Sequence, residues 1–223
     1  MGTATAQLTI AVQDYLKAIY GLESAGERVT TSALAARMGV SAPSATAMTK
    51  RLADLGLVER APYRGVVLTG KGRLGALEVL RHHRLLERYL SDRLGLALDE
   101  VHAEAELLEH ALTEELEAKI DAELGYPTHD PHGDPIPDRD LNVEPGRGRT
   151  LFRLEVGERA TISRVPDGDP ELLRYLTELG LVPESDVEVV TRAPFGGPIT
   201  VRTRNGENAI SRELADRIHA TES

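Results

Sequence analysis

The proline- and glycine-rich stretch at residues 126–148 limits the possible folds of this chain more than any other feature. It holds five prolines and three glycines and contains the run DPHGDPIP. Because proline fixes φ and lacks a backbone donor, this stretch cannot form a long helix or a central strand. Apolar residues before it recur at helical spacing, whereas those after it form short β-like runs. We therefore expect a mostly α chain with a small β part, joined by an irregular linker.

Composition excludes several classes of protein. The chain has 223 residues, of which 41% are hydrophobic, so packed cores can form. It contains no apolar run of about 18 residues, and its N-terminus lacks the basic start of a leader peptide, so we expect a cytoplasmic protein without membrane association. The absence of cysteine excludes disulfides, thiol catalysis and zinc fingers. Any metal site must therefore use His, Asp and Glu.

The first 75 residues predict a winged helix-turn-helix domain. We expect helices over residues 8–24, 31–38 and 44–55, followed by strands over 57–60 and 66–69. Gly39 ends the second helix and makes the tight turn before the third. Residues 61–65 join the two strands and would form a wing with a cationic tip.

Charge is distributed unevenly along the chain, whose net charge is −10. Residues 1–75 carry nine basic and five acidic residues, residues 76–126 carry five and 13, and residues 127–223 carry 12 and 18. The basic first part is where phosphate contacts are expected.

The third helix and the wing of this part offer hydroxyl, proline and cationic side chains to DNA: Ser41, Pro43, Ser44, Thr46, Thr49, Lys50, Arg51 and Arg64. Few long base-reading side chains are among them, so we expect much readout of DNA shape. The alternative is a winged helix used only for protein contact.

The stretch HAEAELLEH, residues 102–110, is rich in groups that bind metals. On a helix at about 100° per residue, its two His and the Glu at 106 and 109 would fall within an arc of about 100°. His83 and Glu87 lie at i and i+4 on another expected helix, residues 74–94, and would project side by side. Two such faces brought together would hold a divalent metal. The alternative is that these acids and histidines are merely solvated.

The opposite side of these helices, including a further helix expected over residues 114–124, is apolar and has no partner within so small a unit. Its residues are Leu107, Leu108, Ala111, Leu112, Leu116 and Ile120. A homodimer would cover this surface. His129 and His132 lie in the linker and could bind metal, but histidines in a flexible linker are more often bystanders.

The last third of the chain predicts a small β-barrel of SH3-like type. Short β runs occur at residues 160–163, 187–191, 199–204 and 209–210, with a helix over 171–179. Asn205-Gly206 is a strong hairpin-turn signal between the last two runs. The expected domains are thus a winged helix over 1–75, a helical metal-binding and dimerisation domain over 76–126, a linker over 127–149 and the SH3-like domain over 150–223.

Taken together, these elements resemble the diphtheria toxin repressor class of metal-dependent transcriptional regulators. The resemblance covers the whole chain: the winged helix, H-x3-E followed by H-x3-E-x2-E-H, the PHGDPIP linker, and an SH3-like FeoA domain containing DPELLRYLTELGLVP. It implies a primary metal site at Asp14, Glu106, Glu109 and His110. It also implies an ancillary site at His83, Glu87 and His102, with a carboxylate from the C-terminal domain, first Glu171 and second Asp169. In some members the counterpart of His83 joins the primary site instead.

The resemblance also bears on which metal is sensed. Iron-sensing members carry methionine and cysteine where this chain has Asp14 and Glu106, whereas manganese-sensing members carry carboxylates. Oxygen and imidazole donors suit Mn²⁺ better than sulfur donors would. Manganese-type sequences also carry a glutamate at the position of Lys17, and this departure keeps Fe²⁺ as an alternative. We expect a dimeric repressor that binds palindromic operators of metal-transport genes with Mn²⁺ as co-repressor.

Three other classes of function compete with a metal-dependent repressor. Helical carboxylates and histidines also form di-iron enzyme sites, but these use Glu-x-x-His motifs, which the sequence lacks. A winged-helix regulator of an organic ligand is disfavoured because two Phe and no Trp leave little to line an aromatic pocket. A pure interaction adaptor would leave the basic N-terminal third without a role.

Overall fold

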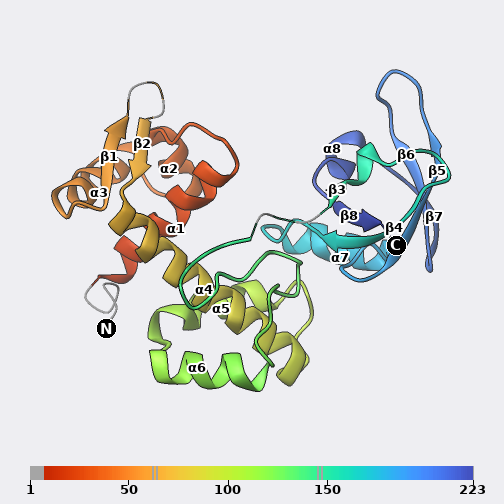
Figure 1. Cartoon of the computed structure of the whole chain (residues 1–223). Coiled ribbons are helices and arrows are strands. Elements are labelled where there is room, and N and C mark those ends of the chain that lie inside the picture. Colours follow the sequence, from red (N-terminus) through yellow and green to blue (C-terminus); the bar gives the residue numbers. More distant parts are fainter. Residues whose placement is uncertain (1–7, 62, 64, 145, 147, 223) are drawn as a thin grey trace. The chain divides into compact units, whose positions relative to one another are not determined.

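A winged helix-turn-helix forms the N-terminal part of the computed structural model (Figure 1). The structure describes residues 8–61, 63, 65–144, 146 and 148–222. They fall into two units, residues 1–82 with 137–142 and residues 83–136 with 143–223. The first unit contains α1 (Ile10–Ser24), α2 (Thr31–Arg37), α3 (Ala42–Asp54), β1 (Val58–Ala61) and β2 (Gly65–Leu68). These elements confirm the predicted ones to within a few residues at each end.

Local capping chemistry explains where α2 and α3 begin. The Thr30 hydroxyl accepts a hydrogen bond from the Ala33 amide at 3.0 Å, and Ser41 accepts one from the Ser44 amide at 3.3 Å. Gly39, at φ +63°, takes the left-handed conformation that the turn between the two helices requires. The apolar faces of the helices then meet in a core that includes Leu16, Ile19, Leu34, Leu52 and Leu57.

The hairpin of β1 and β2 is fixed to the rest of the first unit at two points. The Val66 amide donates to the Val29 carbonyl at 3.0 Å, and a Cβ on Gly65 would lie 2.2 Å from that same carbonyl oxygen. At the other end of β2, the Leu68 amide donates to Oε1 of Glu23 at 3.0 Å. Only glycine fits at position 65, so the hairpin packs against Val29 in one position.

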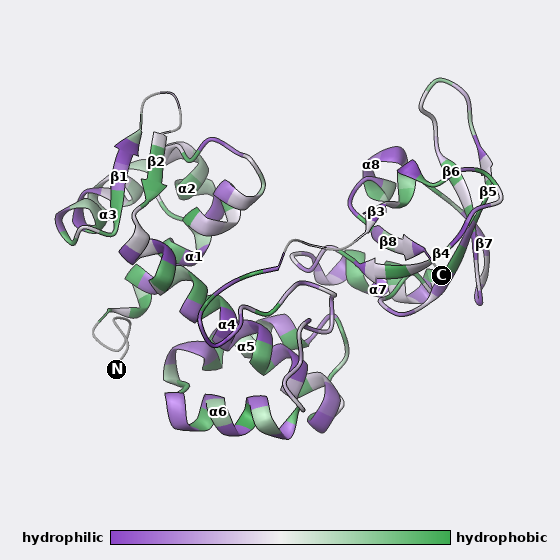
Figure 2. Cartoon of the chain, viewed as in Figure 1, coloured by the Kyte–Doolittle hydropathy of each residue, from purple (hydrophilic) through white to green (hydrophobic). Residues whose placement is uncertain are grey.

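Helix α4 (Gly70–Leu94) begins in the first unit and ends in the second. It starts earlier than the hydrophobic pattern predicts because Thr69 Oγ1 accepts a hydrogen bond from the Gly72 amide at 3.1 Å. In the second unit α4 is followed by α5 (Val101–Leu108) and α6 (Glu114–Glu123). Their shared core contains Leu85, Leu86, Leu90, Val101, Ala105 and Ile120. Figure 2 shows that α6 also carries hydrophobic residues among its hydrophilic ones.

The stretch HAEAELLEH does not form one α-helix, and that prediction is wrong in its last residues. Helix α5 ends at Leu108, and Glu109–Ala111 form a 3₁₀ turn. The chain has to leave the helix here because Leu112 is extended and Thr113 caps α6 by accepting a hydrogen bond from the Leu116 amide. The tighter turn carries Glu109 to a position that is 1% exposed.

The linker is irregular, as predicted, but residues 128–136 form a folded turn. The Asp130 and Ile136 amides donate to the carbonyls of Asp134 and Thr128, at 3.0 and 2.9 Å. From α4, Arg84 Nη1 donates to the Pro135 carbonyl at 2.6 Å. The turn is therefore an ordered part of the second unit.

The C-terminal residues form the antiparallel sheet of the FeoA-like domain. Its elements are β3 (Arg149–Thr150), β4 (Arg159–Arg164), α7 (Pro170–Leu179), β5 (Asp186–Arg192), β6 (Ile199–Thr203), β7 (Gly206–Ile210), α8 (Arg212–Ala215) and β8 (His219–Glu222). The strand order is β3-β8-β4-β5-β6-β7, and Asn205-Gly206 makes the β6–β7 turn as predicted. No pairing between β3 and β7 occurs among the described residues, so the structure shows a small SH3-like sheet without the closure expected of a barrel.

Across the part of the chain that the structure describes, no helix combines the length and the hydropathy needed to span a membrane.

Candidate metal centre and nucleic-acid interface

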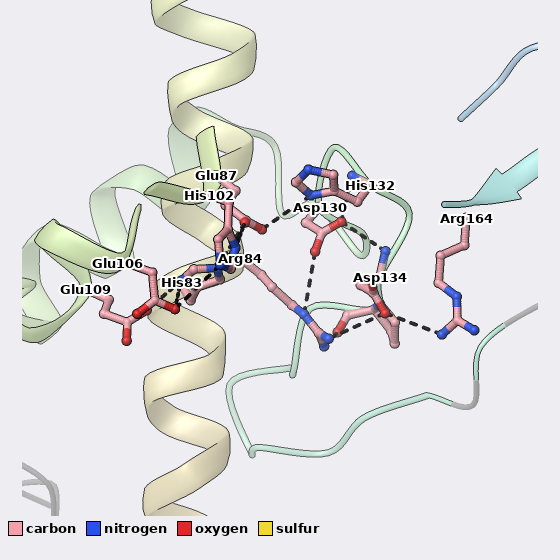
Figure 3. A network of polar contacts seen from close by, with 11 residues as sticks. His83, Arg84, Glu87, His102, Glu106, Glu109, Asp130, His132, Asp134 and Arg164 are labelled. Atoms are coloured by element: carbon pink, nitrogen blue, oxygen red, sulfur yellow. Dashed lines mark hydrogen bonds and ion pairs between the residues drawn. The ribbon is translucent and has the colours of Figure 1, made fainter. Parts of the chain in front are cut away.

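His83 on α4 lies at the centre of a cluster of histidines and carboxylates (Figure 3). Its Nδ1 is 2.5 Å from Oε2 of Glu109, and its Nε2 is 2.9 Å from Oε1 of Glu87 and 3.1 Å from Nδ1 of His102. His83 is 4% exposed and Glu87 is fully buried. One imidazole thus contacts residues that the family resemblance divides between a primary and an ancillary site.

Helix α5 supplies the more accessible side of this cluster. His102 Nδ1 lies 3.1 Å from Glu87 Oε1, and His102 Nε2 lies 3.8 Å from Glu106 Oε1. Donor atoms of His83, His102 and Glu106 all lie within 4.8 Å of one another. His110 follows on the 3₁₀ turn, with Nε2 3.4 Å from Oε1 of Glu109. These six residues of the second unit form what we call the His83 cluster: His83, Glu87, His102, Glu106, Glu109 and His110.

A second group of donors lies on the other side of Glu87, and all of its members are buried. Donor atoms of Glu87, Asp130 and His132 lie within 4.8 Å of one another. The second oxygen of Glu87, Oε2, is 3.7 Å from Nδ1 of His132. Nε2 of His132 lies 3.0 Å from the Leu98 carbonyl, which can only accept, so Nε2 carries a proton. We call these three residues the Glu87 cluster, and Glu87 belongs to both.

Hydrogen bonding in the Glu87 cluster is incomplete. Among the described residues, Glu87 Oε2, Asp130 Oδ2 and His132 Nδ1 are buried without a hydrogen-bond partner. Buried polar atoms normally form hydrogen bonds, and three neighbouring buried acceptors without one need an explanation. Two carboxylate oxygens and one imidazole nitrogen are also ligands that divalent ions take in proteins. The residues present therefore fit a bound divalent cation.

The electrostatics of the Glu87 cluster also favour a bound cation. Burial alone would raise the pKa of Glu87, but its contacts with His102, His132 and His83 outweigh burial and hold that pKa well below the usual range. Burial, together with the charges of Glu87 and Asp134, raises the pKa of Asp130 to about 8. Burial opposes charge on His132, yet Glu87 and Asp130 raise its pKa to about 9. Without a metal, this cluster retains protons near neutral pH.

Two residues of the Glu87 cluster were not among the predicted ligands. His132 does not lie in a flexible linker, because its side chain is fully buried beside Glu87 and the Leu98 carbonyl. Asp130 is the other residue that the sequence did not indicate. The signal available in the sequence was the D-x-H spacing within a rigid proline-rich turn. His129, by contrast, is half-buried, and its ring Nδ1 lies 2.9 Å from the Thr128 hydroxyl.

Three further predicted ligands are Asp14, Asp169 and Glu171. Asp14 belongs to α1 in the first unit. Asp169 caps α7 by accepting hydrogen bonds from the Glu171 and Leu172 amides, and both Asp169 and Glu171 are exposed. Asp169 and Glu171 belong to no group of three or more candidate ligands among the described residues. The C-terminal domain instead approaches the Glu87 cluster through Arg164, which is described below.

Helix α3 presents most of the predicted DNA-contacting side chains to solvent. The exposed ones are Ser41, Pro43, Ser44, Thr46, Lys50 and Arg51. Thr49 is an exception, because it is 8% exposed and its hydroxyl donates to the Ala45 carbonyl at 2.8 Å. Of the predicted DNA contacts on this helix, Thr49 is thus buried rather than exposed, although it lines the cleft beside the wing. Arg64 lies outside the described residues.

A cleft of about 580 Å³ separates α3 from the wing. Thr46 and Lys50 line it from α3, and Arg60 lines it from β1. Arg28, which precedes α2, lines it as well. Three cations around one cleft suit a phosphate backbone. Arg28 and Arg60 were not predicted as DNA contacts, because their position beside α3 depends on the fold of the hairpin and not on sequence spacing.

Three family models match successive parts of the chain. The model described as "Iron dependent repressor, N-terminal DNA binding domain" matches residues 7–66. "Iron dependent repressor, metal binding and dimerisation domain" matches residues 69–138, and "FeoA domain" matches residues 149–222. The three matches follow the order of elements in the structure.

Individual proteins match over nearly the whole chain. The iron-dependent repressor IdeR of Mycobacterium tuberculosis (strain ATCC 25618 / H37Rv) is 33% identical, over 95% of this chain and 97% of its own length. The diphtheria toxin repressor of Corynebacterium diphtheriae is 37% identical, over 93% of this chain and 95% of its own. A solved structure titled "Manganese-dependent transcriptional repressor complex with manganese" is 41% identical, with a TM-score of 0.85, over 95% of this chain and all of its own.

Proposed function

Because the chain belongs to the diphtheria toxin repressor family of metal-dependent transcriptional repressors, we propose that Mn²⁺ is the ion that activates it. Members of this family bind DNA and are not enzymes, so a carboxylate-histidine metalloenzyme is not supported. The protein would act in the cytoplasm as a homodimer on palindromic operators of metal-transport genes. The observation that carries the choice of metal is the His83 cluster, which combines imidazole and carboxylate donors in a chain without cysteine.

The residues assigned to the metal form two groups. We assign His83, His102, Glu106, Glu109 and His110 to one site, with Asp14 joining them from α1 as the family resemblance implies. We assign Glu87, Asp130 and His132 to a second site. His83 is placed with Glu109 because its Nδ1 lies 2.5 Å from Oε2 of Glu109. Glu171 and Asp169 stay predictions for a further carboxylate ligand.

Charge explains why these residues need a cation. Carboxylates a few ångströms apart in partly solvated protein repel by about 1 to 4 kcal/mol per pair. A bound divalent ion supplies the positive charge that reverses this repulsion. Asp14 lies on α1 with the DNA-binding elements, whereas the other proposed ligands lie on α4, α5 and the 3₁₀ turn after it. Shared ligation would therefore fix the DNA-binding unit relative to the dimerisation helices.

The dimer would use the exposed apolar residues of α5 and α6. Leu107 is 75% exposed, and Leu108 and Leu116 are also exposed. Burying such side chains against a second copy is favourable by roughly 25 cal/mol per Å². In a two-fold dimer the two α3 helices would face successive major grooves, about 34 to 36 Å apart. Fixing α1 would hold that spacing, and metal would thus favour DNA binding by a population shift.

Manganese is favoured over iron because both Asp14 and Glu106 offer oxygen. A solved protein that is 41% identical carries manganese in its title, whereas IdeR is titled iron-dependent. The departure at Lys17 supports Fe²⁺ as the second candidate. The test is DNA binding by chelator-treated protein, titrated anaerobically with Mn²⁺ and with Fe²⁺ on DNA selected from a random pool. Activation by Mn²⁺ at lower free-ion concentration supports the proposal, and activation by Fe²⁺ alone refutes it.

A further inference from the structure

The turn that carries Asp130 and His132 lies between helix α4 and strand β4 of the FeoA-like domain. On the β4 side, the Val165 amide donates to the His132 carbonyl at 2.9 Å. Gly133 has φ +91°, and a Cβ there would lie 1.9 Å from the Ser163 carbonyl oxygen. The backbone of the turn is thus in direct contact with the end of β4 at Gly133. This glycine follows the two proposed ligands, Asp130 and His132, and precedes Asp134.

Asp134 joins the two sides of this turn through a pair of arginines (Figure 3). Its Oδ1 lies 3.4 Å from Nη1 of Arg164 on β4 and 3.5 Å from Nη2 of Arg84 on α4. The same Arg84 places Nε 3.5 Å from Oδ2 of Asp130. These side chains are partly buried, so their attraction is screened less than that of a surface pair.

The backbone of Asp134 reaches the proposed ligand directly. Its amide donates to Oδ1 of Asp130 at 2.9 Å, and the His132 amide donates to that same oxygen at 2.9 Å. With Oδ1 occupied by these two amides, Oδ2, which lies 3.5 Å from Arg84 Nε and accepts no hydrogen bond among the described residues, is the oxygen of Asp130 that would bind an ion. A movement of Asp134 would therefore change the orientation of the Asp130 carboxylate.

We propose that Arg164 is a positioning residue for the Glu87 cluster. Through Asp134, it holds the 130–134 turn in the conformation that presents Asp130 Oδ2 and His132 Nδ1 to Glu87. The FeoA-like domain thereby contributes to metal affinity by bracing the ligand turn, in addition to any ligand of its own. This inference rests on the proposed function of the Glu87 cluster as a metal site.

The test compares Mn²⁺ binding by full-length Arg164→Ala and Arg159→Ala proteins using titration calorimetry. Arg159 is a matched control, because it also lies on β4 and pairs with Glu188 at 3.2 Å on the exposed surface. We expect Arg164→Ala to weaken binding at one class of sites about tenfold, as groups that orient metal ligands do. Arg159→Ala should leave both classes unchanged. Equal binding by the two variants would overturn the inference.

Further variants separate positioning from a general loss of structure. Arg164→Lys keeps the charge and should restore most of the affinity. In the double variant, the losses from Asp134→Asn and Arg164→Ala should sum to less than the two single losses, since both substitutions remove the pair between Asp134 and Arg164. In metal-free protein, the His132 and Asp134 amides should exchange hydrogen faster in Arg164→Ala than in Arg159→Ala. Additive losses, or unchanged exchange, would contradict the inference.

Asp130→Asn distinguishes this inference from the proposed function on which it rests. If Asp130→Asn removes one class of Mn²⁺ sites and Arg164→Ala does not affect it, the positioning role alone fails. If Asp130→Asn leaves both classes intact, the Glu87 cluster is not a metal site, and both proposals fail for that cluster.

Discussion

Glu87 and His132 face each other with Oε2 of the carboxylate 3.7 Å from Nδ1 of the imidazole, and neither side chain has exposed surface. Both atoms lack a hydrogen bond among the described residues, as does Oδ2 of the neighbouring Asp130. In a folded protein such atoms are satisfied by water, protons or an ion. Near neutral pH this cluster retains protons, and the exchange of those protons for a metal has measurable consequences.

Metal binding at the Glu87 cluster should release protons. The pKa of Asp130 is raised to about 8 by burial and by nearby carboxylates, and that of His132 to about 9 by Glu87 and Asp130 against the effect of burial. A cation needs both donors deprotonated, so affinity at this site should rise between pH 7 and pH 9. Calorimetry in buffers of different ionisation enthalpy measures the protons released. Asp130→Asn should reduce that number, and an unchanged number would exclude this cluster as the source.

The same two groups predict how the metal-free protein responds to pH. A raised histidine pKa contributes stability that is present below its unfolded value of 6.5 and is lost as pH rises through about 9. A raised carboxyl pKa also makes the folded state less stable as pH rises from 3.8 towards about 8. The metal-free protein should therefore lose thermal stability between pH 6.5 and pH 9. Thermal unfolding with chelator should show the loss, and the loss should be smaller in Asp130→Asn. A decline of equal size in both proteins would contradict this origin.

Glu106 tests the His83 cluster with little risk to the fold, because its side chain is 39% exposed. Glu106→Ala should abolish metal-dependent DNA binding while leaving thermal unfolding of the metal-free protein nearly unchanged. Glu104→Ala is the control, since Glu104 is exposed on the same helix. Fluorescence anisotropy of labelled DNA with and without Mn²⁺ gives the readout. Normal metal-dependent binding by Glu106→Ala would remove this residue from the site.

Lys50 tests the nucleic-acid interface. It is exposed on α3 and lines the cleft beside the wing, so Lys50→Ala should weaken binding to all DNA sequences alike. It should also reduce the slope of log affinity against log salt by about 1. Lys119→Ala removes a cation from α6 and should leave the slope unchanged. Measuring affinity at several salt concentrations decides the matter, and equal slopes for wild type and Lys50→Ala would exclude a phosphate contact.

Substitution of Gly65 tests whether close packing against Val29 fixes the position of the wing. A Cβ at this position would lie 2.2 Å from the Val29 carbonyl oxygen, and φ is +86°. Gly65→Ala should lower the free energy of unfolding by about 1 to 3 kcal/mol and weaken DNA binding, because the hairpin has to shift. Gly26→Ala shares the positive φ but has nothing within 4 Å, so it should cost about 1 kcal/mol and leave DNA binding intact. Equal effects of the two substitutions on DNA binding would contradict the steric argument.

Local signals were sufficient to predict most of the secondary structure. The start of α3 directly after its cap Ser41 and the β6–β7 turn at Asn205-Gly206 are set by capping and turn chemistry within a few residues. The pairing of His83 with Glu87 follows from helical spacing alone. Such features need no knowledge of the rest of the fold.

The features that were missed depend on contacts between distant residues. The position of His132 against Glu87 depends on the packing of a proline-rich turn on α4, and periodicity gives no information about it. Glu109 lies in a 3₁₀ turn and not in the predicted helix because Thr113 caps the next helix, α6. Thr49 is buried because α3 packs its face against the core, although its polar side chain suggested exposure. The closed barrel was expected from strand number and length, which do not determine whether the edge strands meet.

The most direct test of the account is a crystal structure of the dimer grown with Mn²⁺, with anomalous scattering measured at the manganese absorption edge. We expect one anomalous peak within coordination distance of His83 and Glu109, with Asp14 as a further ligand, and another within coordination distance of Glu87, Asp130 and His132. Peaks confined to other residues, or a His83 cluster without any peak at saturating Mn²⁺, would contradict it.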